Sequence, residues 1–266
     1  MTDKDSGKKS PKRGWIGGDY FVASHHLQWV SEVLCEAMDL HATERVLDIA
    51  CGNGNASISA ARRGCRVTGI DLAWELLGQA DERSKAEHVD IRFLEGDAEN
   101  LPFADASFDA ILSTFGVMFA PDRQQAVSEL LRVLKADGEI GLATWWSNTE
   151  VRISDVFSRY TPPLSPEPPL NPWTNEAGLR TLFGDRLSEL SIMPMQVMYR
   201  FPSPDAYADA MLTRYPPWKR IADSLEPDAV ENLKSDLIEE VNRHNRSGDE
   251  TLVSPRDYLQ IIGTKS

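Results

Sequence analysis

The amino-acid sequence predicts an α/β fold built on one doubly wound sheet. Apolar segments of strand length alternate with segments of helical periodicity from about residue 45 to residue 145, which is the pattern of consecutive βαβ units. A glycine-rich turn at residues 50–54 joins the first apolar strand to the first helix of this series. The chain has 266 residues, of which 41% are hydrophobic, so it can bury a sizeable core as a single domain.

The elements of the predicted sheet follow in order. Apolar residues at helical spacing predict a helix over 27–40 ahead of the first strand. Short apolar runs then predict strands near 45–50, 66–70, 90–94, 108–113 and 138–145, and in the first of them Val46, Leu47 and Ile49 are typical of a buried parallel strand. Between them, helices are predicted at about 55–63, 73–87 and 122–135. Ligands of such sheets bind at the carboxyl ends of the strands.

The second half of the chain begins with a proline-rich stretch. Six prolines between residues 160 and 173 predict an irregular extended loop. A helix over 175–183, capped by Thr174 or Asn175, and a long strand over 187–201 follow. Two further helices are predicted at 203–215 and 227–245, and a final strand segment at 252–263.

The turn after the first strand has the composition of a cofactor loop. Gly52 and Gly54 lack Cβ, so they permit positive φ and let a ligand approach the main chain closely. A dinucleotide-binding fingerprint would need a third glycine where this chain has Ser57. The carboxylate of Asp48 would repel a pyrophosphate but attract the cationic amino-acid end of S-adenosylmethionine (SAM). Asp71 ends the next strand, where it can accept hydrogen bonds from both ribose hydroxyls.

Several segments carry a family resemblance beyond this loop. The stretch 93–109 looks like an adenine-binding segment, 108–119 like a fourth strand with its active-site exit, and 129–138 like the helix and turn before strand five. With these motifs the chain resembles the class I SAM-dependent methyltransferases, in the small-molecule branch called methyltransferase type 11. The resemblance is strong from about Gly18 to Trp146. Where the family usually has Pro-Gly-Gly or Pro-Asp-Gly, this chain has Ala136-Asp137-Gly138.

The resemblance implies a Rossmann-like methyltransferase sheet of seven strands, with the last strand antiparallel beside the fifth, and a helical substrate cap. Residues 15–266 would form one methyltransferase domain: a lid and helix at 15–44, a SAM-binding core at 45–146, and the cap and final strands at 147–266. Residues 1–14 are lysine-rich and polar, which predicts a disordered basic tail. Its positive charge is compatible with an anionic partner or with plain solvation.

The expected cofactor is SAM, with S-adenosylhomocysteine as product and no metal. In the family, an Asp followed by Ala contacts the adenine amino group, and here that pair is Asp97-Ala98. The residues expected at the cofactor are Tyr20, Asp48, Ala50, Gly52, Gly54, Asn55, Asp71, Leu72, Asp97, Ala98, Ser113 and Phe115.

Methyl transfer from a sulfonium needs alignment and exclusion of water, and no obligatory catalytic side chain. An acceptor hydroxyl or protonated amine would require a general base, for which His25 and His26 are the candidates ahead of His244. A packing or surface role is the competing interpretation for each of them. Aromatic side chains near the strand ends and in the cap are expected to face the acceptor: Phe119, Trp145 and Tyr215.

Charge and composition limit the partners. A formal net charge of −13 disfavours binding to a nucleic-acid backbone. No apolar run approaches the ~18 residues of a membrane span, and no signal peptide is visible at the N-terminus. The three cysteines lack metal-ligand spacing, and their odd number without an export signal predicts reduced thiols in a cytoplasmic protein. A homodimer is left open.

The leading hypothesis is a methyltransferase that acts on oxygen or nitrogen of a small, partly aromatic or apolar metabolite. Carbon methylation of a quinone-like precursor is an alternative that an apolar cap would allow. A SAM-binding regulator without transfer activity is another, since a fold does not fix a function. A nicotinamide-dependent oxidoreductase is disfavoured by Ser57 and Asp48.

Overall fold

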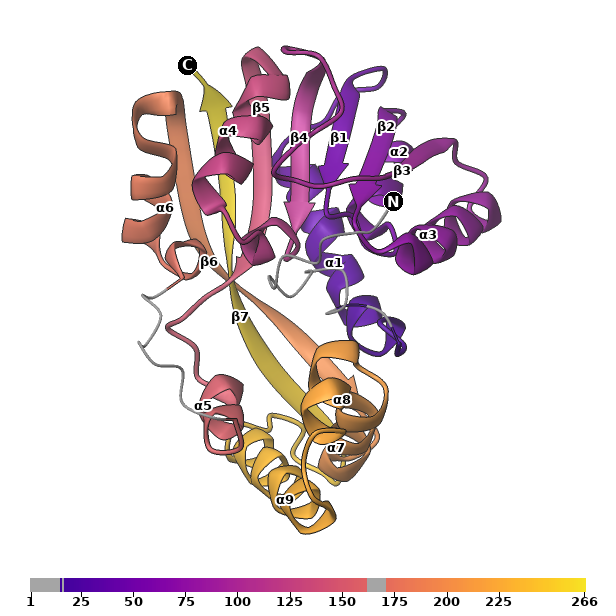
Figure 1. Cartoon of the computed structure of the whole chain (residues 1–266), viewed down its shortest axis with the longest axis vertical. Helices are drawn as coiled ribbons and strands as arrows, with labels where there is room; N and C mark the ends of the chain where they lie inside the picture. Colours follow the sequence, from indigo (N-terminus) through magenta and orange to yellow (C-terminus); the bar gives the residue numbers. More distant parts are fainter. Residues whose placement is uncertain (1–14, 16, 162–170) are drawn as a thin grey trace, which may run out of the picture.

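The computed structural model describes residues 15, 17–161 and 171–266. It has a sheet flanked by helices in its upper part and a helical cap below, as Figure 1 shows. The described residues form one sheet of seven strands in the order β3-β2-β1-β4-β5-β7-β6. The strands are β1 (Arg45–Ile49), β2 (Arg66–Asp71), β3 (Ile91–Glu95), β4 (Phe108–Thr114), β5 (Leu134–Trp145), β6 (Leu187–Phe201) and β7 (Leu252–Lys265).

The strand directions confirm the predicted fold. Strands β1 to β5 pair in parallel, and their order reverses between β1 and β4. Strand β7 lies between β5 and β6 and is antiparallel to both. The molecule therefore has the doubly wound, Rossmann-like seven-stranded sheet with an antiparallel last strand, and ligands of such sheets bind where the strand order reverses.

Helices cover both faces of the sheet. The helices are α1 (Phe21–Ala37), α2 (Asn55–Arg62), α3 (Trp74–Ala86), α4 (Arg123–Val133), α5 (Ile153–Ser158), α6 (Glu176–Phe183), α7 (Pro204–Thr213), α8 (Pro216–Ala222) and α9 (Pro227–Arg243). Helices α4 and α6 share a buried cluster with Leu47 and Ile49 of β1. Helices α1 and α2 pack on the other face with Val46. Both faces of β1 are buried, as expected of a central parallel strand.

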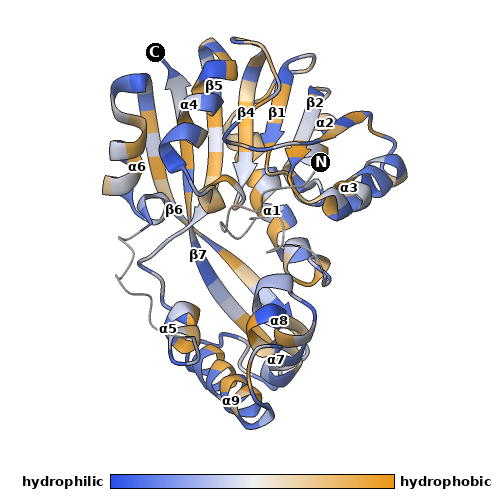
Figure 2. Cartoon of the chain, viewed as in Figure 1, coloured by the Kyte–Doolittle hydropathy of each residue, from blue (hydrophilic) through white to orange (hydrophobic). Residues whose placement is uncertain are grey.

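The cap is built on a long antiparallel pair of strands, β6 and β7, between which α7, α8 and α9 are inserted along the chain; we call this strand pair the hairpin. Strands β5 and β7 stay paired as far as Trp145 and Tyr258, whereas β6 and β7 continue together to Phe201 and Leu252. This extension leaves the sheet and reaches α5, α7, α8 and α9 at the bottom of the molecule (Figure 1). In α9, hydrophobic and hydrophilic residues mix along the helix (Figure 2), and Leu237 is buried on its inner face.

The structure corrects several predicted boundaries. Helix α1 begins at Phe21, earlier than the predicted residue 27. The predicted helix 203–215 ends at Thr213, and a separate helix, α8, begins at Pro216 because proline can start a helix but not continue one. Asn175, not Thr174, caps α6 by accepting a hydrogen bond from the N–H of Gly178 at 2.8 Å. The predicted tail 1–14 and the prolines at 162–169 lie outside the described residues.

Candidate active site

The candidate active site consists of two adjoining cavities. The first lies at the carboxyl ends of the parallel strands and encloses about 940 Å³ of space, its open mouth included. We call it the strand-end cavity. The second, the aromatic cavity, lies between the sheet and the cap and encloses about 1850 Å³ on the same basis. Trp15 and Phe119 line both cavities, so the two spaces meet at these rings.

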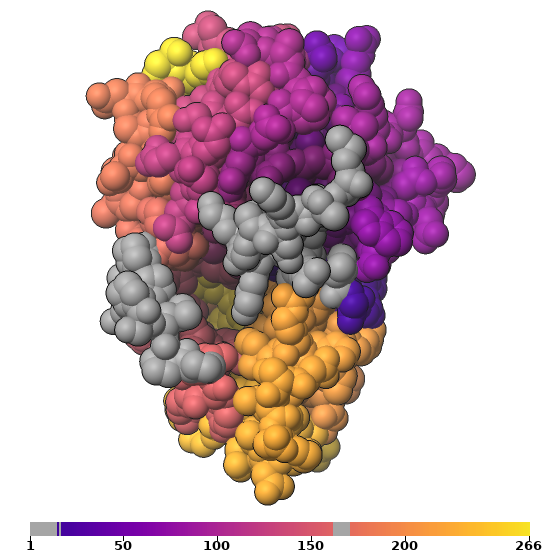
Figure 3. All heavy atoms as spheres, viewed as in Figure 1, coloured from indigo at the N-terminus to yellow at the C-terminus, as the bar shows by residue number. Residues whose placement is uncertain are grey.

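Figure 3 shows a hollow between the core and α8, at the bottom of which atoms of the C-terminal strand are visible by their yellow colour. Residues of this strand, Arg256 and Asp257, line the aromatic cavity. The cap and the core thus enclose a space between them that a small molecule can fill.

The turn after β1 forms one wall of the strand-end cavity. Ala50 and Gly52 there have φ of 52° and 55°, and Gly54 has φ of 85° as the N-cap of α2. A Cβ at Gly54 would also lie 3.1 Å from the Cβ of Ala80, so both conformation and space favour glycine at this position. The chain therefore turns sharply enough to present its backbone to the cavity.

Asp71 lies at the carboxyl end of β2 and lines the strand-end cavity. Its carboxylate accepts hydrogen bonds from the N–H groups of Gly52 at 2.8 Å and Ala73 at 2.7 Å. Burial raises its pKa, and the backbone hydrogen bonds act in the opposite direction. Each oxygen has two lone pairs, so the carboxylate can fix the glycine turn and still accept hydrogen bonds from a ligand.

Most of the residues expected at the cofactor line this cavity. They are Tyr20, Ala50, Gly52, Asn55, Asp71, Leu72, Asp97, Ala98 and Phe115. The structure brings them together from the lid, the glycine turn and the ends of β2, β3 and β4.

Three residues of that set, Asp48, Gly54 and Ser113, are not part of the cavity wall. Asp48 is buried under the turn, where it accepts a 2.6 Å hydrogen bond from the hydroxyl of Ser57. Its other oxygen has no hydrogen-bond partner in the described chain, and burial raises its pKa to about 7. The hydroxyl of Ser113 donates to the carbonyl of Ile49 at 2.7 Å and accepts from the N–H of Val117 at 3.1 Å. In this structure Ser113 joins β4 to β1.

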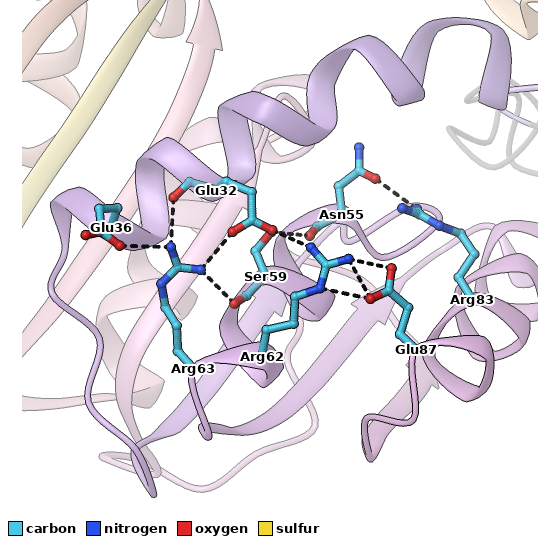
Figure 4. Close-up of polar contacts among 8 residues, drawn as sticks. All are labelled: Glu32, Glu36, Asn55, Ser59, Arg62, Arg63, Arg83 and Glu87. Carbon is cyan, nitrogen blue, oxygen red and sulfur yellow. Dashed lines mark hydrogen bonds and ion pairs between the residues drawn. The ribbon is translucent and has the colours of Figure 1, made fainter.

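Polar contacts from α1 and α3 hold the glycine turn and the start of α2. Asn53 and Asn55 donate to the hydroxyl and the carbonyl of Ser24, at 2.7 and 2.8 Å. Arg83 donates to the carbonyl of Asn53 at 2.6 Å and to the amide oxygen of Asn55 at 2.8 Å. Figure 4 shows the last of these contacts beside a network in which Glu32 of α1 binds residues of α2. Helix α1 is thereby fixed against the glycine turn.

Aromatic rings form the boundary between the two cavities. The ring of Trp15 lies 5.7 Å from Tyr20, 5.0 Å from Phe119 and 6.3 Å from Tyr215, measured between centroids. Phe115, in the strand-end cavity, stacks on Trp145, in the aromatic cavity, at 4.1 Å. Phe119, Trp145 and Tyr215, the residues expected to face the acceptor, all line the aromatic cavity.

The two candidate bases lie on α1, outside both cavity walls. The Nδ1 of His25 is 2.6 Å from the carbonyl of Phe21. His26 stacks on Tyr199 at 4.6 Å, and Tyr199 in turn lines the aromatic cavity. Burial, together with the charges of His25 and Arg256, lowers the pKa of His26 to about 4, so its ring is neutral at pH 7. Neither histidine lines a cavity in which an acceptor could bind. A base role for them stays a prediction.

Sequence reasoning missed part of the aromatic cavity wall, including Tyr199, Tyr207 and Arg256. Tyr199 lies in a strand, and a strand pattern does not tell which face meets a cavity. Arg256 stands in the polar stretch Ser254-Pro255-Arg256-Asp257 of the last strand, and the structure shows that most of this strand is buried. A charged residue in such a place is seldom buried without a role.

Among the described residues, no group of His, Cys, Asp and Glu side chains could hold a metal ion. In the same residues, no helix has both the length and the apolar character to cross a membrane.

Comparisons with known proteins agree with this geometry. Residues 46–138 match a family model described as a methyltransferase domain. The chain is 33% identical over 246 residues to an uncharacterized protein of Mycobacterium tuberculosis, covering 90% of this chain and 89% of that protein. It is 30% identical over 185 residues to the demethylmenaquinone methyltransferase of Deinococcus radiodurans, covering 69% of this chain and 71% of the relative.

Solved structures share the fold. The YcgJ protein of Bacillus subtilis matches with a TM-score of 0.57 at 20% identity, over 91% of this chain and 98% of that chain. Phosphoethanolamine N-methyltransferase 2 of Haemonchus contortus, solved with S-adenosylhomocysteine, matches with a TM-score of 0.57 at 16% identity. That match covers 91% of this chain and 56% of the Haemonchus chain.

Proposed function

Because the chain belongs to the class I SAM-dependent methyltransferases, we propose that it transfers a methyl group from SAM to oxygen or nitrogen of a small, partly aromatic or apolar metabolite. The observation that carries the proposal is the junction of the two cavities at Trp15 and Phe119. One cavity has the carboxylates and the glycine turn for a nucleoside-bearing cofactor, and the other has aromatic walls for an acceptor. The cell compartment proposed for this reaction is the cytoplasm.

The donor set of the strand-end cavity fits SAM. Asp71 is a half-buried carboxylate at the end of β2 with lone pairs left for two ribose hydroxyls. Asp97, with Ala98 beside it, would accept from the adenine amino group, while Leu72 and Leu76 offer apolar contact to the base. The backbone of Gly52 would lie against the amino-acid end. In such a complex SAM supplies an electrophilic methyl group on a sulfonium.

The protein's own contribution is alignment. Phe119 and Trp15 lie where the cavities meet, so an acceptor in the aromatic cavity would approach the cofactor beside these rings. Their faces favour a cation over water. Tyr20 covers the glycine turn from the lid, with Cε1 3.5 Å from the position that a Cβ on Gly52 would take. Alignment and exclusion of water are the main demands of a direct in-line displacement.

Carbon methylation of a quinone-like compound is the second candidate. The support for it is the 30% identity to a demethylmenaquinone methyltransferase together with the apolar lining of the aromatic cavity, which includes Trp145, Phe157 and Trp218. Activity on a panel of phenols, amines and quinols separates the two candidates by the atom that carries the new methyl group.

Binding of S-adenosylhomocysteine, measured by calorimetry, tests the cofactor. We expect micromolar binding by the wild-type protein and none of NAD. The Asp71→Ala variant should bind at least about 10-fold more weakly, because hydrogen bonds to a charged acceptor are worth roughly 1.5–3 kcal/mol each. Asp81→Ala, which changes a carboxylate on the outer surface of α3, is the matched control and should bind normally. Absence of binding by the wild-type protein would refute the proposal.

A further inference from the structure

Arg256 is a buried charge in the wall of the aromatic cavity. It lies on β7 in the part of the hairpin that extends into the cap, and only 8% of its surface is exposed. Its guanidinium lies over the rings of Tyr199 and Tyr207, at 5.2 and 5.5 Å from their centroids. Burying a cation is unfavourable unless the site provides hydrogen bonds and opposite charge. These rings supply part of that compensation.

The hydrogen bonds of Arg256 leave donors free. Nη1 donates to the hydroxyl of Ser254 at 2.6 Å and to the carbonyl of Pro255 at 2.8 Å, and Nη2 donates to the hydroxyl of Tyr207 at 2.9 Å. A guanidinium has five N–H donors, so these three bonds leave two, on Nε and Nη2. No carboxylate in the described ranges pairs with Arg256. Two neighbouring N–H groups of this kind match the two oxygens of a carboxylate.

Arg256 forms no ion pair with the other charged residues that the structure describes in the cavity wall. Asp257 also lines the cavity, but its carboxylate accepts hydrogen bonds from Thr149, Gln196 and the N–H of Glu150. Arg220 of α8 adds a second, more exposed positive charge to the lining. With two arginines and one carboxylate, the wall of the aromatic cavity has an excess of one positive charge, in a chain with a net charge of −13.

We propose that the methyl acceptor carries a carboxylate, which Arg256 binds while the aromatic or apolar body of the acceptor fills the cavity. The inference rests on the proposed function and names its substrate class. Tyr207 supports it, because its hydroxyl accepts from Arg256 and keeps its own hydrogen for an anion. Arg256 lies two residues, about 7 Å along the strand, beyond Tyr258, which pairs with Trp145. The carboxylate would therefore be held on the cap side, and the opposite end of the acceptor would point to Phe119.

Calorimetric binding of matched probes tests this proposal. Benzoate, 1-naphthoate and indole-3-carboxylate are each compared with the corresponding neutral amide, with S-adenosylhomocysteine present in excess. The wild-type protein should bind at least one acid about 10-fold or more tightly than its amide. Arg256→Gln should abolish that preference and leave binding of the amide within about 3-fold. Arg256→Lys keeps the charge and loses the two-pronged geometry, so it should retain part of the preference.

The control is Arg200→Gln, which changes an exposed arginine on the neighbouring strand, outside the cavity wall. It should bind every probe like the wild type. Unchanged affinity of Arg256→Gln for S-adenosylhomocysteine verifies that the variant is folded. The proposal is overturned by equal binding of acids and amides, by loss of both in Arg256→Gln, or by no saturable binding of any acid. Failure of the wild-type protein to bind S-adenosylhomocysteine would instead count against the methyltransferase activity. The ratio of acid to amide affinity is a separate measurement, and it tests only the proposed carboxylate.

Discussion

Two charged side chains of opposite sign lie at the two ends of the candidate site. Asp71 faces the strand-end cavity and Arg256 the aromatic cavity. Arg256 is buried and Asp71 is half-buried, and both have hydrogen-bonding capacity that the protein itself does not use. Charged groups shielded from water are costly to leave unpaired, so each is best explained by a ligand that completes its hydrogen bonds.

Asp48 should make the stability of the protein depend on pH. Burial raises its pKa from 3.8 to about 7, so between about pH 4 and pH 7 the folded protein keeps a proton that the unfolded chain releases. Stability therefore falls as the pH rises through this window. From pH 5 to pH 8 the titration of Asp48 should lower the free energy of unfolding of the wild type by roughly 2–3 kcal/mol, and we expect Asp48→Asn to lack this decrease.

Urea denaturation at both pH values measures this difference, with Asp81→Asn as a control on the surface of α3. An identical pH dependence in Asp48→Asn and the wild type would show that Asp48 is ionised in the folded protein throughout.

His26 distinguishes packing from base catalysis. Since its ring lies against Tyr199 and outside the cavity wall, we expect His26→Gln to reduce kcat less than about 10-fold once an acceptor is known. General-base catalysis is typically worth 10²–10⁴-fold. A loss of 100-fold or more, with a changed pH profile of kcat, would establish the base role instead. His25→Gln in the same assay tests the neighbouring ring.

At the scale of elements, α1 connects the aromatic residues at its start to the glycine turn and to α2. Tyr20 and Ser24 near its start contact the glycine turn, and Glu32 farther along binds α2. The position of α1 relative to α2 therefore determines where Trp15 and Tyr20 lie. A change in the middle of α1 should reach the strand-end cavity through these contacts.

Glu32 is the residue with which to test that connection. One of its oxygens accepts from Ser59 and Arg62, at 2.8 and 2.7 Å, and the other accepts from Arg63 at 2.9 Å. Glu32→Ala should cost about 1–3 kcal/mol, lowering the thermal midpoint by several degrees at about 2–4 °C per kcal/mol. Glu36→Ala is the control: its carboxylate is 83% exposed and also pairs with Arg63, so its loss should cost less than about 0.5 kcal/mol. Equal midpoints for the two variants in a thermal melt would contradict the connection.

The sequence predicted the elements of the parallel core well because their signals are local. The alternation of apolar strands and helices located β1 to β5, and Gly52 and Gly54 marked the turn. The boundary between α4 and β5 was less accessible: residues 136–138 lie within β5, where the register with β4 shifts by a bulge. A bulge depends on pairing with another strand, and a local pattern does not contain that information.

For the molecule as a whole, the hairpin of β6 and β7 joins the cap to the sheet. Both strands stay paired from the sheet edge at Leu187 and Lys265 to the cap at Phe201 and Leu252, with one register shift between Leu187 and Glu189. The cap and the core should therefore unfold together, because the same two strands belong to both.

Leu237→Ala tests that cooperativity. The side chain is fully buried in α9, in the cluster that packs on the hairpin extension. Its truncation should cost about 2–5 kcal/mol and lower the midpoint of one single unfolding transition. Affinity for S-adenosylhomocysteine should stay unchanged, since α9 does not line the strand-end cavity. Two separate transitions in calorimetric scans would show that the cap unfolds independently.

The long-range features of the site were beyond local prediction. Phe119, Trp145 and Tyr215 were expected to face an acceptor, and they line one cavity. Arg256 and Tyr207 join that cavity only because the hairpin extends past the sheet and α7 packs back on it. Asp48 and Ser113 lie near strand ends, as expected, but neither lines the strand-end cavity. Asp48 accepts from Ser57 and Ser113 donates to the carbonyl of Ile49, so both stabilise the loops that follow the strands.

A crystal structure with S-adenosylhomocysteine tests the central claim most directly, that a cofactor in the strand-end cavity meets an acceptor in the aromatic cavity. We predict that its ribose hydroxyls lie on Asp71 and that its sulfur lies beside Trp15 and Phe119, open toward Trp145. A sulfur directed away from the aromatic cavity, or a ligand bound outside the strand-end cavity, would contradict the account.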